Sequence, residues 1–226
     1  MMKPIKIAID GPAGAGKSTI AKQIADRLDI IYLDTGAMYR AIGFKCLQED
    51  IDLKDMQAIS ELLNNTHIYI TFENNSQNII LDGVDISDKI RTTAVSNAAS
   101  YVATLPEVRK KLVDIQRTIG KDKSIVMDGR DIGTYVFPDA DVKIFLTASL
   151  EERAKRRWLE YGERGEHKDL DSIIKDIEQR DRSDSTREFA PLKKADDAIV
   201  VDTTDKSIEK VVDTIIQIIN DRVFIC

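Results

Sequence analysis

The sequence predicts an α/β fold in which a parallel five-stranded sheet is flanked by helices, with a small β-rich insert and a helical lid. First, a glycine-rich stretch at residues 11–18 stands between an apolar segment and a segment with helical spacing. Second, apolar segments of strand length alternate with amphipathic segments over most of the 226 residues, which is typical of a parallel sheet covered on both faces. Third, residues 64–92 break this alternation with two adjacent strand-like segments.

The strands of the sheet are predicted from short apolar segments. They lie at residues 3–9, 30–33, 124–127, 142–146 and 198–201. Ligands of such sheets bind at the carboxyl ends of the strands. The glycine-rich stretch, residues 34–39 and residues 128–131 each follow a strand, so we expect functional groups in these three places.

Most of the helices are predicted from apolar residues that recur at three- and four-residue spacing, and those at 151–160 and 171–184 are predicted as polar helices. The predicted helices lie at residues 18–28, 36–48, 93–103, 106–119, 151–160, 171–184 and 208–219. Thr35 can cap the second of these helices, and Pro106 suits the first turn of the fourth.

The β-rich insert is predicted from two strand-like segments, 67–72 and 78–81, which a polar turn at residues 73–76 joins. A second tight turn follows at Asp82 and Gly83. We therefore expect three parts. Residues 1–63, 93–148 and 188–226 form a core, and residues 64–92 form an insert that can extend to about residue 105. Residues 149–187 form a lid with its adjoining helix.

The glycine-rich stretch fits the pattern G-x-x-x-x-G-K-[ST] of a phosphate-binding P-loop. Its residues are Gly11, Pro12, Ala13, Gly14, Ala15, Gly16, Lys17 and Ser18. Glycines let the backbone N–H groups surround an anion, and the following helix offers its positive end. We expect Lys17 to reach the β- and γ-phosphates of ATP, Ser18 to place its hydroxyl on Mg²⁺, and Thr19 to support the first helical turn. The alternative is a plain glycine-rich turn with an exposed Lys17.

The composition excludes several classes of protein. The net charge of -6 argues against a general nucleic-acid binder. The two cysteines, Cys46 and Cys226, are far apart, which favours a reducing compartment over a disulfide framework. Asp10 ends the first apolar run early, so we expect no secretory signal, and no apolar stretch approaches the length of a membrane span. These observations predict a cytoplasmic protein without a nucleic-acid or membrane partner.

Charged residues follow two of the other predicted strands. Asp128 could act on Mg²⁺ directly or through water, Arg130 could hold a phosphate with its two-pronged guanidinium, and Asp131 could accept a hydrogen bond from a cytosine amino group. The alternative for these three is a solvated turn whose charges pair among themselves. In the second helix, Arg40 could hold a second phosphate and Tyr39 could pack against it, or both could be ordinary surface groups.

The segment from residue 151 to residue 187 is rich in arginine within an acidic protein. Its arginines are Arg153, Arg156, Arg157, Arg164, Arg180, Arg182 and Arg187. Acidic residues are interleaved, so a pair of exposed, salt-bridged helices is one interpretation. The other is a mobile lid whose arginines neutralise a phosphoryl group in transit and exclude water, with flexible points at Gly162 and Gly165.

Taken together, these segments resemble the bacterial cytidylate kinases, a family of nucleoside monophosphate kinases. The resemblance rests on residues 9–19, 33–40, 96–100, 128–134, 137–141, 180–181 and 190–192. It implies transfer of the γ-phosphoryl group of ATP to CMP or dCMP with Mg²⁺, in pyrimidine nucleotide metabolism. It also implies a P-loop core, a lid and an enlarged monophosphate-binding domain, which agrees with the β-rich insert.

The resemblance also implies roles for individual residues. Lys17, Arg130, Arg153 and Arg157 are expected to be catalytic. The expected CMP-binding residues are Thr35 and Tyr39 in the acceptor pocket, Arg40 and Arg130 near the phosphate, Ser100, Arg109 and Asp131 near the cytosine, Arg180 and Asp184 near the ribose, Arg187 near the nucleotide, and Asp128. The Asp131 carboxylate can accept a hydrogen bond from the cytosine amino group, whereas it repels the O4 acceptor of uracil. UMP should therefore be rejected.

Three other functions compete with this interpretation. A related kinase could act on UMP or shikimate. A regulatory GTPase would carry a guanine-reading Asn-Lys-x-Asp sequence, and the chain contains none. A protein that only binds nucleotide would keep its function without Lys17. We expect a monomer whose partners are ATP and CMP or dCMP.

Overall fold

The computed structural model describes residues 3–73, 76–163 and 165–223. Its chain forms two compact units, of which the larger comprises residues 1–31 and 123–226 and the smaller comprises residues 32–122. The division into core, insert and lid stays a prediction. Cys226 and Arg164 lie outside the described residues, as do Asn74 and Asn75 of the expected turn.

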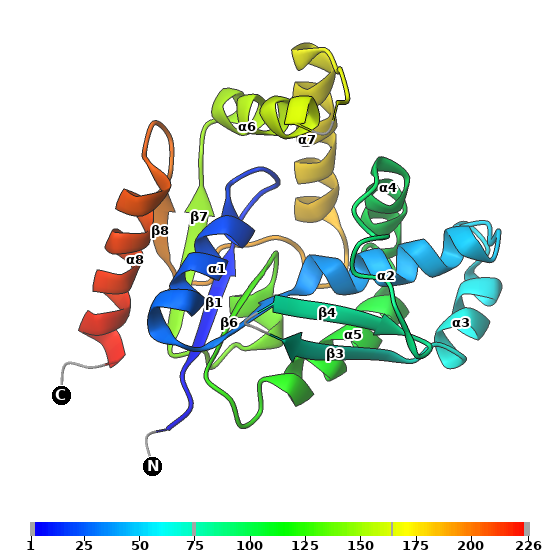
Figure 1. Ribbon diagram of the computed structural model, residues 1–226, viewed down its shortest axis with the longest axis horizontal. Coiled ribbons are helices and arrows are strands. Elements are labelled where there is room, and N and C mark those ends of the chain that lie inside the picture. The colour runs from blue at the N-terminus through cyan, green and yellow to red at the C-terminus, as the bar shows by residue number, and fades with distance from the viewer. Residues whose placement is uncertain (1–2, 74–75, 164, 224–226) are drawn as a thin grey trace. The chain divides into compact units, whose positions relative to one another are not determined.

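A parallel five-stranded sheet confirms the predicted fold class, and its strand order is β2-β6-β1-β7-β8 (Figure 1). Its strands are β1 (Lys6–Asp10), β2 (Ile31–Asp34), β6 (Ile125–Gly129), β7 (Val142–Thr147) and β8 (Ile199–Asp202). The central strand β1 is almost completely buried, and its Ile9 lies opposite Asp128 of β6 and Ile144 of β7. The carboxyl end of β1 therefore lies beside the carboxyl ends of two neighbouring strands.

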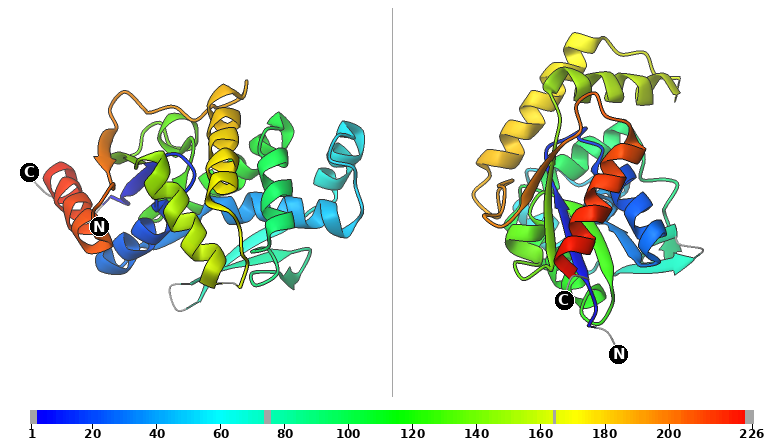
Figure 2. Two further views of the ribbon diagram at one scale, coloured as in Figure 1. Left: turned by 90° about the horizontal axis from the view of Figure 1, so that it is seen from above. Right: turned by 90° about the vertical axis from the view of Figure 1, so that its left-hand side faces the viewer.

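The larger unit carries four α-helices and one short π-helix among its described residues. They are α1 (Lys17–Leu28), η1 (Ile132–Val136), α6 (Leu150–Glu163), α7 (Leu170–Thr186) and α8 (Ile208–Val223). Helices α1 and α8 lie side by side (Figure 2), and each turns apolar residues such as Ile24 and Ile215 inward. Helices α6 and α7 share a small core of their own, which contains Tyr161 and Ile173.

The smaller unit combines four helices with a second sheet. Its elements are α2 (Thr35–Gln48), α3 (Met56–Asn64), β3 (Ile68–Glu73), β4 (Ser76–Leu81), β5 (Val84–Asp85), α4 (Thr93–Val102) and α5 (Pro106–Ile119). The three strands form an antiparallel sheet in the order β3-β4-β5, and β3 and β4 are the two strands that the sequence predicts. Helix α4 approaches α2 so closely that a Cβ on Gly43 would lie 2.7 Å from the backbone nitrogen of Ala99.

The cap of α2 differs from the prediction. Thr35 is the first residue of the helix, and the capping residue is Asp34, whose Oδ1 accepts a hydrogen bond from the Ala37 N–H at 3.0 Å. Asp34 keeps the extended backbone of β2, so the change from strand to helix occurs one residue earlier than expected. Cys46, on the same helix, is buried.

Candidate active site

The P-loop follows β1 without a break and packs against β7 and α6. Gly11 has φ +153°, and a Cβ there would lie only 2.0 Å from the carbonyl oxygen of Leu146. Gly14 has φ +74°, and a Cβ there would lie 3.1 Å from Cβ of Arg153. Both positions exclude side chains because of backbone conformation and of close neighbours. The loop then leads into α1, where Ser18 and Thr19 are exposed in the first turn.

Lys17 is the buried cation of this loop. Its side chain is 6% exposed, and its Nζ donates a hydrogen bond to the Pro12 carbonyl at 2.7 Å. Burial lowers the pKa of Lys17 well below its usual value, and the nearby charge of Arg130 lowers it further. The negative charge of an incoming phosphate group would oppose both effects, because it favours the charged form of Lys17.

Ser18 at the start of α1 and Asp128 at the end of β6 bring two side-chain oxygen atoms together. The Ser18 hydroxyl donates to Oδ2 of Asp128 at 2.9 Å, and Asp128 is 5% exposed. Within residues 3–73, 76–163 and 165–223, no group of three or more His, Cys, Asp and Glu side chains could hold a metal ion. A hydroxyl and one carboxylate nevertheless fit Mg²⁺, which takes most of its ligands from water and substrate phosphates.

Arg153 of α6 and Asp181 of α7 hold Ala13 of the P-loop from two sides. Nη1 of Arg153 donates to the Ala13 carbonyl at 2.9 Å, and Oδ1 of Asp181 accepts from the Ala13 N–H at 3.0 Å. The two side chains also form an ion pair with each other at 2.5 Å. Sequence reasoning placed Arg153 in the site but gave Asp181 no role, because nothing in the pattern shows which face of α7 meets the loop.

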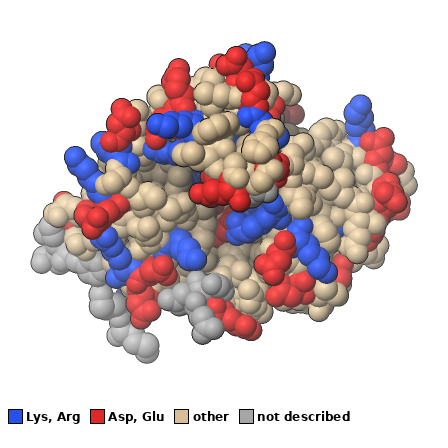
Figure 3. Space-filling view, turned by 45° about the horizontal axis from the view of Figure 1, so that its top comes forward, with Lys and Arg blue, Asp and Glu red and all other residues tan. Residues whose placement is uncertain are grey.

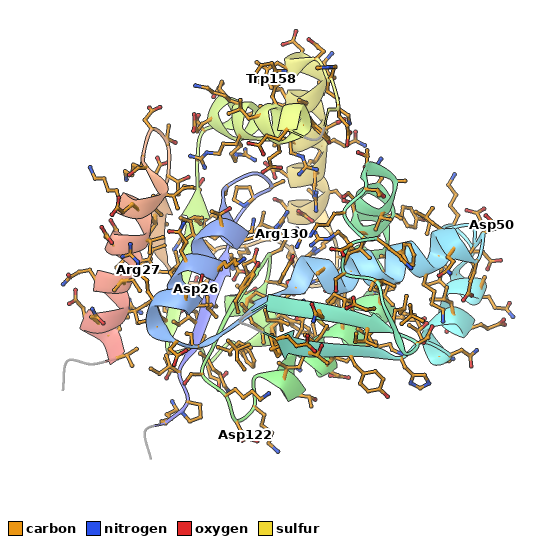
Figure 4. The ribbon with its side chains drawn as sticks, viewed as in Figure 1. Asp26, Arg27, Asp50, Asp122, Arg130 and Trp158 are labelled. Atoms are coloured by element: carbon orange, nitrogen blue, oxygen red, sulfur yellow. The ribbon has the colours of Figure 1, made fainter. Side chains whose placement is uncertain are left out.

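A second ionic group lies where β6 and the end of α7 meet. Nε of Arg130 lies 2.7 Å from Oδ2 of Asp184, and Arg130 is labelled in Figure 4 near the C-terminal end of α7. Arg187 lies 3.5 Å from both Asp131 and Asp184 and donates from Nε to the carbonyl of Ala190 at 2.7 Å. The structure therefore brings together four of the residues that the sequence selects.

The acid in this group stays ionised although it is largely buried. Burial raises the pKa of Asp184, but the charges of Arg130 and Arg180 outweigh this effect and hold that pKa below its usual value. Arg130 shows the converse, since burial lowers its pKa but the Asp184 carboxylate outweighs burial and holds that pKa above its usual value. Arg180 stands one turn before Asp184 on α7, and its charge also lowers the pKa of Lys17.

The other arginines of α6 make different contacts. Arg157 pairs with Glu160 of its own helix at 3.0 Å and lies over the ring of Tyr161. Arg156 donates to the carbonyl of Thr203 at 2.8 Å, and its Nη1 would lie 3.6 Å from a Cβ placed on Gly16. Arg153 and Arg156 thus approach the P-loop, whereas the contacts of Arg157 match those of an exposed, salt-bridged helix.

The smaller unit holds the remaining predicted residues. Nη2 of Arg40 lies 2.6 Å from Oδ2 of Asp34. Arg109 is 1% exposed, and its guanidinium lies 5.4 Å from the centre of the Tyr39 ring. Ser100 donates to the Ser96 carbonyl one turn earlier at 3.0 Å. Thr35 is buried at the start of α2.

Charged side chains of both signs lie on the face that Figure 3 presents. Figure 3 shows lysine and arginine side chains interspersed with aspartate and glutamate over the face that it presents, without a continuous basic surface. In the described part of the chain, the helices are too short or too polar to cross a membrane. Trp158 of α6 is 49% exposed (Figure 4).

Comparison with known proteins gives one consistent result. The family model described as cytidylate kinase matches residues 7–221. A cytidylate kinase of Caldicellulosiruptor saccharolyticus is 54% identical over 217 residues, which are 96% of both chains. A cytidylate kinase of Geobacillus sp. (strain WCH70) is 54% identical over 223 residues, which are 99% of this chain and all of that protein. Among solved structures, an uncharacterized protein from Eubacterium ventriosum matches 96% of this chain with a TM-score of 0.55 and 15% identity, a likeness of fold alone.

Proposed function

Because the chain belongs to the cytidylate kinase family, we propose that it transfers the γ-phosphoryl group of ATP to CMP or dCMP and releases ADP with CDP or dCDP. The family match over nearly the whole chain carries this proposal. The P-loop, with its buried lysine and its hydroxyl–carboxylate pair, supports it independently.

The larger unit carries the groups that suit the donor. Residues Gly11 to Thr19 bind the ATP phosphates through backbone N–H groups, and Lys17 places its ammonium group beside them. Ser18 and Asp128 hold Mg²⁺, which neutralises charge on the phosphate oxygens. The attacking oxygen of CMP is already anionic, so catalysis consists of positioning and charge neutralisation by Lys17, Arg130 and the arginines of α6.

The remaining predicted residues suit the acceptor nucleotide. We assign the CMP phosphate to Arg40 and Arg130, the cytosine to Ser100, Arg109 and Asp131, and the ribose to Arg180 and Asp184, with Thr35, Tyr39, Asp128 and Arg187 supporting them. Asp131 is 4% exposed, so a base that turned an acceptor toward its carboxylate would leave buried polar groups unpaired. This selects cytosine over uracil.

The test is a coupled assay with ATP, Mg²⁺ and each of the four common nucleoside monophosphates. We expect CMP and dCMP to be the preferred acceptors, Lys17→Ala to remove nearly all turnover, and Asp131→Asn to weaken selection against UMP. Equal turnover of CMP and UMP by the unaltered protein would contradict the assignment of Asp131. A cytoplasmic location and a monomeric state are proposals that rest on composition alone, and light scattering tests the second.

A further inference from the structure

Gln77 of β4 makes a two-point contact with the backbone at the end of β2. Its Oε1 accepts the Asp34 N–H at 2.7 Å, and its Nε2 donates to the Asp34 carbonyl at 3.2 Å. A side-chain amide that bonds both groups of one residue imitates the pairing of a neighbouring strand. The β-rich segment thereby fixes the backbone of Asp34.

Asp34 in turn uses its two carboxylate oxygens for two different partners. Oδ1 caps α2 through the Ala37 N–H, and Oδ2 lies 2.6 Å from Nη2 of Arg40. Asp34 is 8% exposed, so this pair is shielded from water. The turn leaves little freedom, because a Cβ on Gly36 would lie 3.1 Å from Oδ1 of Asp34 and 3.3 Å from Nη1 of Arg40.

Arg40 keeps donor capacity beyond its bond with Asp34. Its Nε is buried and has no hydrogen-bond partner among the described residues, and a guanidinium carries five N–H donors in a fixed plane. Arg91 approaches the same carboxylate, with its Nη2 4.0 Å from Oδ2 of Asp34. One carboxylate between two arginines leaves an excess of positive charge, which suits an anion such as a phosphate group.

We propose that Gln77 is a positioning residue, through which the β-rich segment holds Asp34 and so orients Arg40 toward the phosphate of the acceptor nucleotide. The inference rests on the proposed function, in which Arg40 binds that phosphate. It gives the three-stranded sheet a part in substrate binding through one side chain, without contact between that side chain and the substrate.

The test compares Gln77→Ala, Gln77→Glu and Arg40→Lys in steady-state kinetics with CMP and ATP varied separately. Loss of the two bonds of Gln77 should raise KM for CMP roughly fivefold to tenfold, because Asp34 and Arg40 lose part of their orientation, and should leave KM for ATP unchanged. Gln77→Glu keeps the acceptor for the Asp34 N–H but turns an oxygen toward the Asp34 carbonyl, so it should not restore the unaltered KM. Gln57→Ala is the control, because the side chain of Gln57 bonds Glu61 of its own helix at 3.1 Å and its other described bond, from the backbone N–H to Asp55, survives the substitution.

A double variant separates positioning from simple support of the fold. If Gln77 acts through Arg40, adding Gln77→Ala to Arg40→Lys should raise KM for CMP by less than twofold beyond Arg40→Lys alone. Full multiplication of the two effects, or equal changes in both KM values, would overturn the inference. An unchanged KM for CMP in Gln77→Ala would also overturn it while the kinase assignment stands. Absence of CMP turnover in the unaltered protein would instead refute the proposed function.

Discussion

Replacement of Asp184 by Asn removes the charge that balances Arg130 and Arg187 while it keeps the volume of the side chain. The side chains of Arg130 and Asp184 are 18% and 15% exposed, and their atoms lie 2.7 Å apart. Removal of one partner from a buried ion pair costs about 3–5 kcal/mol. Asn keeps one acceptor oxygen and the pair is not fully buried, so we expect a loss of about 2–3 kcal/mol in the free energy of unfolding at pH 7.

The dependence on pH has a definite sign. The folded-state pKa of Asp184 is depressed, so its contribution to stability is present above the pKa of the unfolded chain and is lost as pH falls through the folded-state value. The difference between the unaltered protein and Asp184→Asn should therefore be constant from pH 7 to about pH 5. It should shrink as pH falls below about 4.

Urea unfolding in a phosphate-free buffer, followed at several pH values, measures this difference. Asp176→Asn is the matched control, because Asp176 is an exposed acid on the same helix and should change stability by less than about 0.5 kcal/mol. A loss below about 0.5 kcal/mol for Asp184→Asn at pH 7, or a loss that stays constant down to pH 3, would refute the electrostatic reasoning.

Three further outcomes concern the P-loop and its surroundings. Because burial depresses the pKa of Lys17, ATP binding above neutral pH should take up a proton, and calorimetry in two buffers of different ionisation enthalpy should give different heats. Gly14→Ala should raise KM for ATP at least about tenfold, since φ is +74° and Arg153 is in the way, whereas Gly83→Ala, with φ +84° and open space, should not. Burial raises the pKa of Asp10 to about 7, so the folded state holds more protons than the unfolded chain between about pH 4 and 7, and stability should fall as pH rises through that window. Asp10→Asn should reduce the dependence of the free energy of unfolding on pH, measured with urea. An unchanged dependence on pH would contradict the role assigned to Asp10.

The sheet and the P-loop could be predicted because their signals are local. Residues 3–28 carry the strand, the loop and the helix in one continuous pattern, and the structure keeps all three. Helix α3 was missed, although Asp55 caps it and Ile59, Leu62 and Leu63 lie on its buried face. The helical pattern of α3 is present in the sequence, but it spans only nine residues and lies next to the β-rich segment.

Other features depend on contacts distant in sequence. The π-helix η1 has no helical pattern, and its first N–H groups are held by Asp10, which accepts from Ile132 at 2.8 Å and from Gly133 at 2.7 Å. A carboxylate more than a hundred positions away thus determines the local backbone. Arg153 and Arg157 look alike in the sequence, yet only the packing of α6 decides that Arg153 meets the loop and Arg157 meets Glu160.

The two bonds at Ala13 make one backbone amide a reporter of helix movement. Its N–H is held by Asp181 of α7, and its carbonyl is held by Arg153 of α6. Its hydrogen can exchange with solvent deuterium only when the Asp181 bond opens. The exchange rate of this single amide would therefore record how often the helix pair releases the P-loop, in the absence of any nucleotide and without a label attached to the protein.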